Sequence, residues 1–220
     1  MPQKISDGST KEKLLEAAKK EFMQNGFLKA SLRTICKNAG VTTGALYFFF
    51  HDKEDLFDSI VKPVIDHATQ ILAEHFKHED SLLSGSGPVL MQTLVHEANK
   101  KDSAKGDLST ALAIFRYLYS HYDEFILIVQ KSQGTKWEGC VNSFVDWNYK
   151  HLKSIADSYC KSHGKKKIKP FVLRMVSNSQ INCFVNIVLN IPSFKEAEKH
   201  LPSVMHYLVG GWCTLFDQNI

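Results

Sequence analysis

Apolar residues recur at intervals of three and four along almost the whole chain, and the alternating pattern of β-strands is nearly absent. Residues 79–88 are rich in serine and glycine and are expected to form a loop. The chain is therefore predicted to be all-α, with about nine helices. Helices are predicted to begin at Ser9, Ser31, Thr42 and Asp52, and others at about 88–101, 107–121, 122–132, 137–163, 170–191 and 194–217.

Polar residues and glycines mark the ends of the first helices. Ser9 is followed three residues later by Glu12, which forms a capping box that satisfies free backbone N–H groups. The other three predicted starts are also serine, threonine or aspartate, which accept hydrogen bonds at this place. Gly26 and Gly40 are placed to end the first two helices.

The helix that begins at Asp52 is expected to be long, because its apolar stripe continues to Phe76. Pro63 lies inside this helix and lacks the N–H group that would bond to the Ser59 carbonyl, so a kink is predicted. The chain is divided into a domain at 1–57 and a helical domain at 58–220.

Two short helices joined by a tight turn that contains glycine predict a helix-turn-helix in the first domain. The major groove of DNA is about 12 Å wide and admits a helix whose outer face carries small or polar residues. Gly44 costs roughly 1 kcal/mol of helix stability relative to alanine, but it lets the backbone approach DNA closely. The outer face of the second short helix is predicted to carry Thr42, Thr43, Gly44, Tyr47 and Phe48.

Charge and composition fit this prediction. The net charge is +4, and residues 1–53 hold nine Lys and Arg against five Asp and Glu. The five cysteines are dispersed, so reduced thiols are expected rather than disulfides or a metal site. We expect no cofactor. No apolar run approaches the ~18 residues of a membrane span, and the N-terminal residues do not read as a signal peptide, so a cytoplasmic protein that does not bind membranes is expected.

Residues 10–57 resemble the DNA-binding domain of the tetracycline-repressor (TetR) family of bacterial regulators. The resemblance covers about a quarter of the chain and rests on many fixed spacings. The matching elements are Asn25-Gly26-Phe27, Ser31-Leu32-Arg33, Ala39-Gly40-Val41-Thr42-Thr43-Gly44, Leu46-Tyr47, Phe50 and Lys53-Glu54-Asp55-Leu56.

This resemblance implies DNA-binding roles for matched positions. The segment from Thr42 to Gly44, with Thr43 between them, corresponds to residues that face phosphates or base edges. Tyr47 and Lys53 correspond to phosphate contacts, and Arg33 corresponds to a residue that reads guanine in some members.

Three consecutive phenylalanines follow Tyr47. Many family members have histidine where this chain has Phe49, and an aromatic residue or histidine at Phe48. Phe48 therefore either contacts DNA methyl groups and sugars or packs against the protein. For Phe49 and Phe50, packing in the core is the preferred interpretation.

The resemblance also implies a homodimer whose last two helices pair with the partner, and a small-molecule pocket in the C-terminal domain. Wide apolar coverage of residues 170–191 and 194–217 agrees with burial on two sides. The candidate dimer residues are Val176, Phe184, Val188, Val204, Leu208 and Trp212. The candidate pocket residues, each of which could instead be ordinary core, are His96, Phe115, Tyr119, Phe125, Trp137, Phe144, Trp147, Asn182 and Asn186.

The predicted function is a repressor that binds a palindromic operator in double-stranded DNA as a homodimer and is released by a small-molecule effector. An activator, or a regulator without ligand response, is an alternative that the sequence does not distinguish. His75, His78 and Glu79 are the nearest approach to a metal-sensing site, but a third ligand is not nearby, so no metal and no enzymatic activity are expected. The lysine run at 165–169 is interpreted as a solvated loop rather than a nucleic-acid patch.

Overall fold

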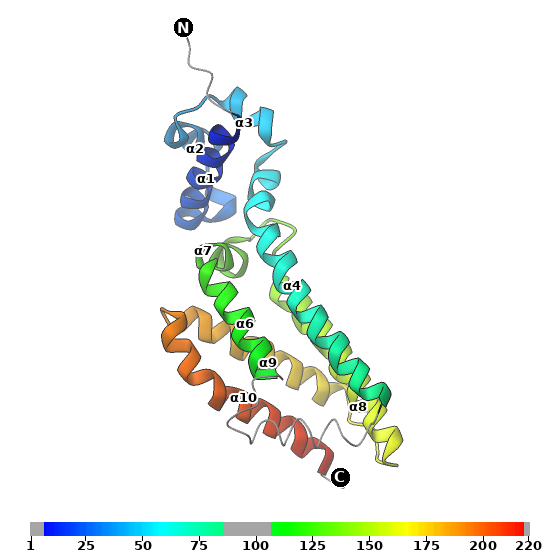
Figure 1. Ribbon diagram of the computed structural model, residues 1–220. Helices are drawn as coiled ribbons and strands as arrows, with labels where there is room; N and C mark the ends of the chain where they lie inside the picture. The colour runs from blue at the N-terminus through cyan, green and yellow to red at the C-terminus, as the bar shows by residue number, and fades with distance from the viewer. Residues whose placement is uncertain (1–6, 86–106, 218–220) are drawn as a thin grey trace. The chain divides into compact units, whose positions relative to one another are not determined.

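The computed structural model describes residues 7–85 and 107–217 (Figure 1). These residues form α-helices and one π-helical turn, η1 (Leu127–Lys131), and include no β-strand. The prediction of an all-α chain is confirmed. The helices are α1 (Asp7–Lys29), α2 (Leu32–Ala39), α3 (Thr43–Phe49), α4 (Lys53–Gly85), α6 (Asp107–Ser120), α7 (Tyr122–Ile126), α8 (Cys140–Ser162), α9 (Pro170–Asn190) and α10 (Phe194–Asp217).

The chain divides into two compact units. The first unit runs to His67 and also takes in His121–Cys140, so α7 and η1 pack with the N-terminal helices. The second unit holds the rest of α4 together with α6, α8, α9 and α10. The predicted boundary at residue 57 lies inside α4, whose residues up to His67 belong to the first unit.

The predicted caps of α2 and α3 are present. The Ser31 side chain accepts a hydrogen bond from the Thr34 N–H group, and the Thr42 hydroxyl accepts one from Ala45 N at 3.2 Å. Gly40 ends α2 in the left-handed conformation, with φ at 68°, which a residue without a Cβ adopts without strain. Local chemistry therefore sets the ends of α2 and the start of α3.

The first helix differs in detail from its prediction. It already includes Asp7, so Ser9 lies within the helix instead of at its cap. At Gly26 the backbone leaves the helical region, with φ at 68° and ψ at 167°, and a short final turn runs on to Lys29. The predicted stop at Gly26 is thus a break in α1, since glycine can adopt this positive φ.

The fourth helix is longer than predicted. It continues through Pro63 and runs to Gly85, so the loop predicted from residue 79 is wrong for residues 79–85. Glu79 is buried and its carboxylate lies 2.6 Å from Nε2 of His151 on α8, a contact that local composition does not reveal. The predicted helix at 88–101 and the candidate pocket residue His96 lie outside the described residues.

Aromatic rings form much of the core of the first unit. The ring of Phe22 lies 5.1 Å from that of Phe57, and Phe27 lies 5.5 Å from Phe57, both edge to face. Leu46 from α3 and Phe50 are also buried. Burying each such side chain contributes about 1.5–3 kcal/mol to folding, so this core holds α3 firmly against the unit.

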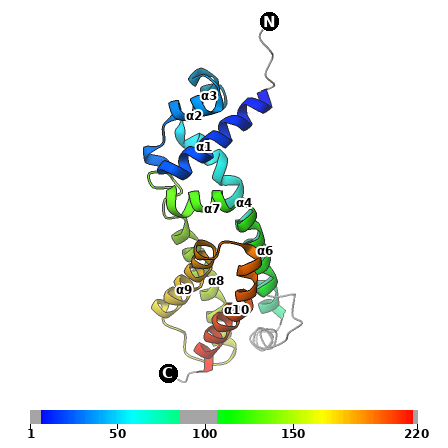
Figure 2. The ribbon, with the colours of Figure 1, turned by 90° about the vertical axis from the view of Figure 1, so that its left-hand side faces the viewer.

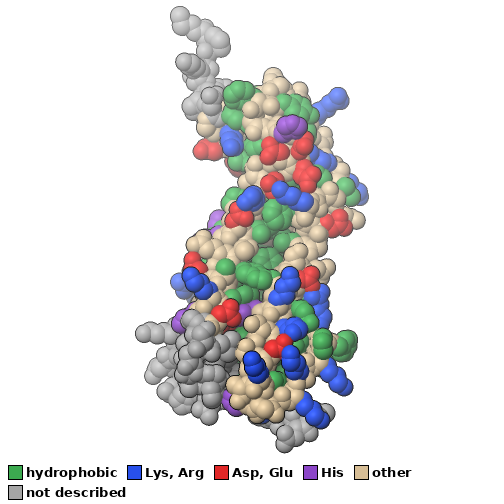
Figure 3. Space-filling model, turned by 90° about the vertical axis from the view of Figure 1, so that its right-hand side faces the viewer, with side chains coloured by type: hydrophobic (Ala, Val, Ile, Leu, Met, Phe, Trp, Pro, Cys, Tyr) green, Lys and Arg blue, Asp and Glu red, His purple; other side chains and the backbone are tan. Residues whose placement is uncertain are grey.

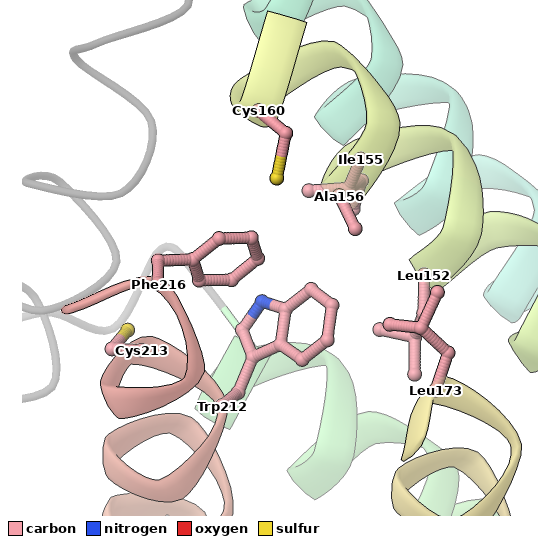
Figure 4. Close-up of a cluster of buried hydrophobic side chains, with 8 residues drawn as sticks. All are labelled: Leu152, Ile155, Ala156, Cys160, Leu173, Trp212, Cys213 and Phe216. Carbon is pink, nitrogen blue, oxygen red and sulfur yellow. The ribbon is translucent and has the colours of Figure 1, made fainter. Parts of the chain in front are cut away.

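The second unit has its own core between α8, α9 and α10. Figure 2 shows α9 and α10 beside each other with α8 behind them. The indole of Trp212 meets the ring of Phe216 edge to face, with 5.0 Å between their centres. Both residues belong to a cluster of buried apolar side chains, drawn in Figure 4, that consists of Leu152, Ile155, Ala156, Cys160, Leu173, Trp212, Cys213 and Phe216.

No described helix is both long and apolar enough to cross a membrane.

Candidate DNA-binding interface

The short helix α3 has one buried and one exposed face. Leu46 is fully buried, and this orients Tyr47 and Phe48 toward solvent, with 58% and 74% of their surfaces exposed. Thr42, Thr43 and Gly44 are also exposed. Figure 3 shows hydrophobic side chains reaching the surface of the first unit. The five residues predicted for the outer face of the helix therefore share one exposed surface.

The three consecutive phenylalanines pass from this surface into the core. Phe48 is exposed, Phe49 is half-buried and Phe50 is buried. The Phe48 and Phe49 rings meet edge to face with centres 4.9 Å apart, and the Phe49 and Phe50 centres are 6.4 Å apart. Of the two readings left open for Phe48, packing in the protein core does not apply. The core interpretation holds for Phe50 and only partly for Phe49.

Lys53 connects the start of α4 to the end of α1. Its ammonium group donates hydrogen bonds to the carbonyls of Leu28, at 3.2 Å, and Ala30, at 3.3 Å, and lies 4.6 Å from the centre of the Phe27 ring. Two of the three hydrogens of this ammonium are thus used inside the protein. The phosphate contact implied for Lys53 would have to use the third, and the sequence did not indicate this internal role.

The remaining predicted contact residue, Arg33, lies exposed in the first turn of α2. The neighbouring start of α4 is capped by Asp52, whose carboxylate accepts from Asp55 N at 2.8 Å. This hydrogen bond holds the pKa of Asp52 below its ordinary value. The Asp55 carboxylate accepts in turn from the backbone N–H of His51, at 2.8 Å. The turn between α3 and α4 is therefore fixed by reciprocal hydrogen bonds.

Residues 14–60 match the family model for bacterial regulatory proteins of the tetR family. This part of the chain is therefore similar to the N-terminal region of tetR-family regulators. Relatives in this region are the transcriptional repressor BepR of Brucella suis, 43% identical over 58 residues, and the transcriptional regulator AcrR of Shigella flexneri, 47% identical over 51 residues. These alignments cover 26% and 23% of this chain, and they span only 28% and 24% of the lengths of the relatives.

Two solved structures share the fold of this chain over nearly its whole length. NalD of Pseudomonas aeruginosa, the secondary repressor of a multidrug efflux pump, has a TM-score of 0.58 at 18% identity and covers 92% of this chain and 97% of its own. A TetR-like regulator from Rhodococcus sp. RHA1 has a TM-score of 0.58 at 14% identity and covers 96% and 99%. The chain therefore shares its fold with these two regulators.

Two candidate pocket residues, Phe125 and Trp137, lie in the first unit. Trp137 donates its indole N–H to the Asp58 carboxylate at 2.8 Å, and Phe125 is buried. The Lys136 ammonium also lies 3.0 Å from Asp58, and its backbone N–H donates to Glu54 at 3.1 Å. The segment before α8 is thus attached to the first turns of α4.

The remaining aromatic candidates lie in the second unit, in two groups. Phe115 is buried and meets Phe184 edge to face at 5.6 Å, and the Tyr119 hydroxyl donates to the Ile191 carbonyl at 2.9 Å. In the other group, Trp147 lies 6.3 Å from Phe144 and 5.0 Å from Phe76. Of the two candidate asparagines, Asn182 is half-buried and Asn186 is exposed.

A buried group of polar residues adjoins the second aromatic group. The Glu79 carboxylate lies 2.6 Å from His151 Nε2 and 3.6 Å from His75 Nε2. The Thr110 hydroxyl lies 3.2 Å from His75 Nδ1, and the Phe76 ring stacks on the His151 ring at 3.9 Å. Burial lowers the pKa of His75. Among the residues that the structure describes, no three His, Cys, Asp or Glu side chains are arranged to hold a metal.

The candidate dimer residues differ in accessibility. Val188, Leu208 and Trp212 are buried within their own chain. Val176, Phe184 and Val204 are half-buried, and Val176 packs against the cluster of Figure 4. The large apolar residues exposed on the last two helices are instead Phe171 and Met175 on α9 and Tyr207 on α10, which sequence reasoning missed because their exposure depends on how the helices pack.

Proposed function

We propose that this protein is a repressor that binds a palindromic operator as a homodimer and leaves it when a small molecule binds the second unit. The observation that carries the proposal is the exposed face of α3, which holds threonines, a glycine and two aromatics on a helix whose opposite face is buried. BepR and NalD are both named as repressors, which supports repression rather than activation.

The proposed contacts divide into phosphate binding and base reading. The hydroxyls of Thr42, Thr43 and Tyr47 reach phosphates or base edges, and Gly44 allows the backbone of α3 to approach the groove. Arg33 reads a guanine through paired hydrogen bonds to its O6 and N7 atoms. Lys53 adds positive charge near the backbone while it holds α1 and α4 together.

A homodimer would place two such helices in successive major grooves, about 34 Å apart. The proposed interface lies on α9 and α10, where Phe171, Met175 and Tyr207 leave large apolar groups in water. Half-buried Val176, Phe184 and Val204 lie on the same two helices and would complete it. The buried candidates Val188, Leu208 and Trp212 would support these helices from behind.

The proposed effector site lies in the second unit, among the aromatic residues of α6, α8 and α9. Aromatic walls with few polar groups suit a largely apolar small molecule. Helix α4 contributes residues to both units, so a ligand that shifts α4 would change the position of α3. A ligand that binds the state unable to engage DNA more tightly lowers the affinity for DNA by the same coupling free energy.

Electrophoretic shift assays with DNA from upstream of the gene test the proposal. We expect specific binding, and we expect Arg33→Ala to reduce discrimination at one base pair by about 1–3 kcal/mol. The matched control is Lys150→Ala, which removes an exposed positive charge from α8 and should leave binding unchanged. The proposal fails if the protein binds this DNA no better than unrelated duplexes.

A further inference from the structure

We propose that the buried carboxylate of Glu79, together with the aromatic rings of Phe76, Phe144 and Trp147, binds an organic cation with a largely apolar body. This inference rests on the proposed function, because it names the chemical class of effector that the second unit takes. It places the effector site on α4 and α8 and assigns recognition of the positive charge to one side chain.

The first observation is a carboxylate inside the second unit. Glu79 is only 8% exposed, although its neighbours on α4, His78 and Asp80, are exposed. Removing a carboxylate from water costs free energy unless a positive charge or hydrogen bonds replace the water. The groups that surround Glu79 therefore decide how strongly it attracts a further cation.

The second observation is that these groups are imidazoles. Nε2 of His151 lies 2.6 Å, and Nε2 of His75 lies 3.6 Å, from Oε2 of Glu79. A neutral imidazole donates a hydrogen bond but carries no net charge. Burial lowers the pKa of His75, which keeps this ring neutral in neutral solution. Glu79 therefore keeps its negative charge whenever His151 is neutral as well.

The third observation concerns the second oxygen of the carboxylate. Both histidines contact Oε2, and the described residues supply no hydrogen bond to Oε1. Every fully buried side-chain oxygen in the described part of the chain has a hydrogen-bond partner, so Oε1 lies where solvent or a ligand reaches it. A ligand cation can thus approach Glu79 from the side of Oε1.

The fourth observation is the aromatic surface beside the carboxylate. The Phe76 ring stacks on the His151 ring, with centres 3.9 Å apart, and meets the Trp147 ring edge to face at 5.0 Å. Phe144 lies 6.3 Å from Trp147. Phe76, Phe144 and Trp147 are half-buried, so part of each ring remains accessible. The faces of aromatic rings attract cations, and the indole of tryptophan does so most strongly.

The carboxylate and the rings together select the charge of the ligand. The rings accept the apolar body of a cation, an anion or a neutral molecule alike. Glu79 distinguishes these classes, because a charge inside a protein attracts a cation and repels an anion more strongly than it does in water. A neutral molecule would cover the carboxylate without supplying a charge. The site therefore favours an apolar organic cation.

Two probe ions of nearly equal size and shape and of opposite charge test the inference. The cation is tetraphenylphosphonium and the anion is tetraphenylborate, and isothermal titration calorimetry measures the affinity of the full-length protein for each. We expect the cation to bind at least about tenfold more tightly. The net charge of +4 would favour the anion if no specific site existed. Equal affinities, or tighter binding of the anion, would overturn the inference.

Three variants locate the site. Glu79→Gln keeps an oxygen acceptor for the His151 N–H and removes the charge, so it should abolish the preference for the cation. Glu74→Gln removes an exposed carboxylate of the same helix, which accepts from Gln70, and as the matched control it should keep the preference. Trp147→Leu should weaken binding of the cation about fivefold through the loss of the indole face.

Urea denaturation checks that each variant is folded. The inference is overturned if the preference for the cation persists in Glu79→Gln. It is also overturned if Trp147→Leu binds the cation as tightly as the wild-type protein does, a result that does not depend on the folding of Glu79→Gln.

Electrophoretic shift assays separate this inference from the proposed function. Saturating tetraphenylphosphonium should release the wild-type protein from its operator and should not release Glu79→Gln. Binding of the cation without release would contradict the proposed release mechanism, and the cation site would stand. Specific DNA binding by a protein that shows no preference for the cation would contradict only the inference about Glu79.

Discussion

At the level of single residues, Lys53 combines a position typical of DNA contact with a role inside the protein. Its ammonium group bonds to the carbonyls of Leu28 and Ala30, which follow the break of α1 at Gly26. Carbonyls at the end of a helix lack partners within the helix, and a cation satisfies them. A loss of DNA binding on mutation of Lys53 would therefore combine the loss of a charge with a structural change in the first unit.

Replacing Lys53 by methionine separates these effects, because methionine keeps an aliphatic stem near Phe27. We expect Lys53→Met to lower the free energy of unfolding by about 1–2 kcal/mol through the loss of two charged hydrogen bonds. Urea denaturation measures this change. Lys20→Ala, which removes an exposed ion pair with Glu16, is the control and should cost less. Equal losses in both variants would show that the Lys53 hydrogen bonds add nothing.

Gly44 is expected to make α3 less stable than alanine would, and to allow the backbone to approach DNA more closely. Gly44→Ala has room for its Cβ and should raise the free energy of unfolding by up to about 1 kcal/mol, because alanine is the better helix former. The same methyl group should weaken operator binding if the backbone approaches the groove. Thermal unfolding and electrophoretic shifts measure the two effects. Unchanged DNA affinity in the stabilised variant would rule out close approach at this position.

At the level of elements, the segment from α7 to the start of α8 packs with the N-terminal helices. Lys19 on α1 lies 3.1 Å from Glu124 on α7, and Gly134 lies so close to Leu28 that a Cβ there would be 2.5 Å from a Leu28 methyl group. Trp137 and Lys136 bond to the start of α4. This segment is thus part of the support for α1 and the start of α4.

Trp137→Phe tests that support by removing the indole N–H while it keeps an aromatic ring. We expect it to lower the free energy of unfolding by about 1–3 kcal/mol, since the Asp58 carboxylate loses a hydrogen-bond donor. Asp58→Asn keeps an oxygen acceptor for the indole and should be milder. Chemical denaturation compares the two variants. A larger loss in Asp58→Asn would mean that the Lys136 ion pair, and not the indole, holds the segment.

Helices α4, α6 and α8 meet at His75, which should make stability depend on pH. Burial lowers the pKa of His75, against the opposing Glu79 charge, and the histidines His151 and His78 lower it further. The folded state therefore disfavours the protonated form. The contribution of neutral His75 to the free energy of unfolding is fully present above the pKa of about 6.5 in the unfolded chain. It is lost as the pH falls through the lowered pKa of the folded state.

Urea denaturation between pH 8 and pH 5 measures this dependence. The wild-type protein should lose stability toward pH 5, and His75→Gln should lose less, because glutamine does not titrate. The difference between the two proteins isolates His75 from the other histidines. Parallel curves for the two would contradict a buried neutral His75.

At the level of the whole molecule, the proposed repressor requires two copies of the chain. The exposed apolar residues of α9 and α10 offer a surface for the second copy. The basic loop at 165–169, which precedes α9, is also exposed, except for half-buried Ile168. Isologous dimers bring the same patch of each copy together, so one substitution acts twice. Dimerisation is therefore best tested at a central exposed position.

Met175→Glu places two charges in the proposed interface and should convert the dimer to monomers, as light scattering after gel filtration would show. Operator affinity should fall with it, since each monomer contacts one half-site. Lys166→Glu in the neighbouring loop is the control and should remain dimeric. A dimeric Met175→Glu protein would place the interface elsewhere.

The sequence by itself determined the all-α fold class, the short helices α2 and α3 of the first unit and the residues on the exposed face of α3. It could do so because caps such as Ser31, Thr42 and Gly40 act on backbone groups within a few residues. The exposed face follows from the helical period once Leu46 is identified as apolar.

Only the tertiary structure decided the course of α4 beyond Glu79, the location of Trp137 beside Asp58 and the burial of Trp212 within its own chain. Each depends on a contact between residues far apart in sequence, which no local pattern records. Burial of the Glu79 carboxylate is favourable because it lies beside His151, which is far away in sequence. An aromatic ring packs equally well in a core, a pocket or an interface, so its sequence position does not tell these apart. Local chemistry therefore determined the bounds and the exposed face of α3, and long-range packing determined the structure around it.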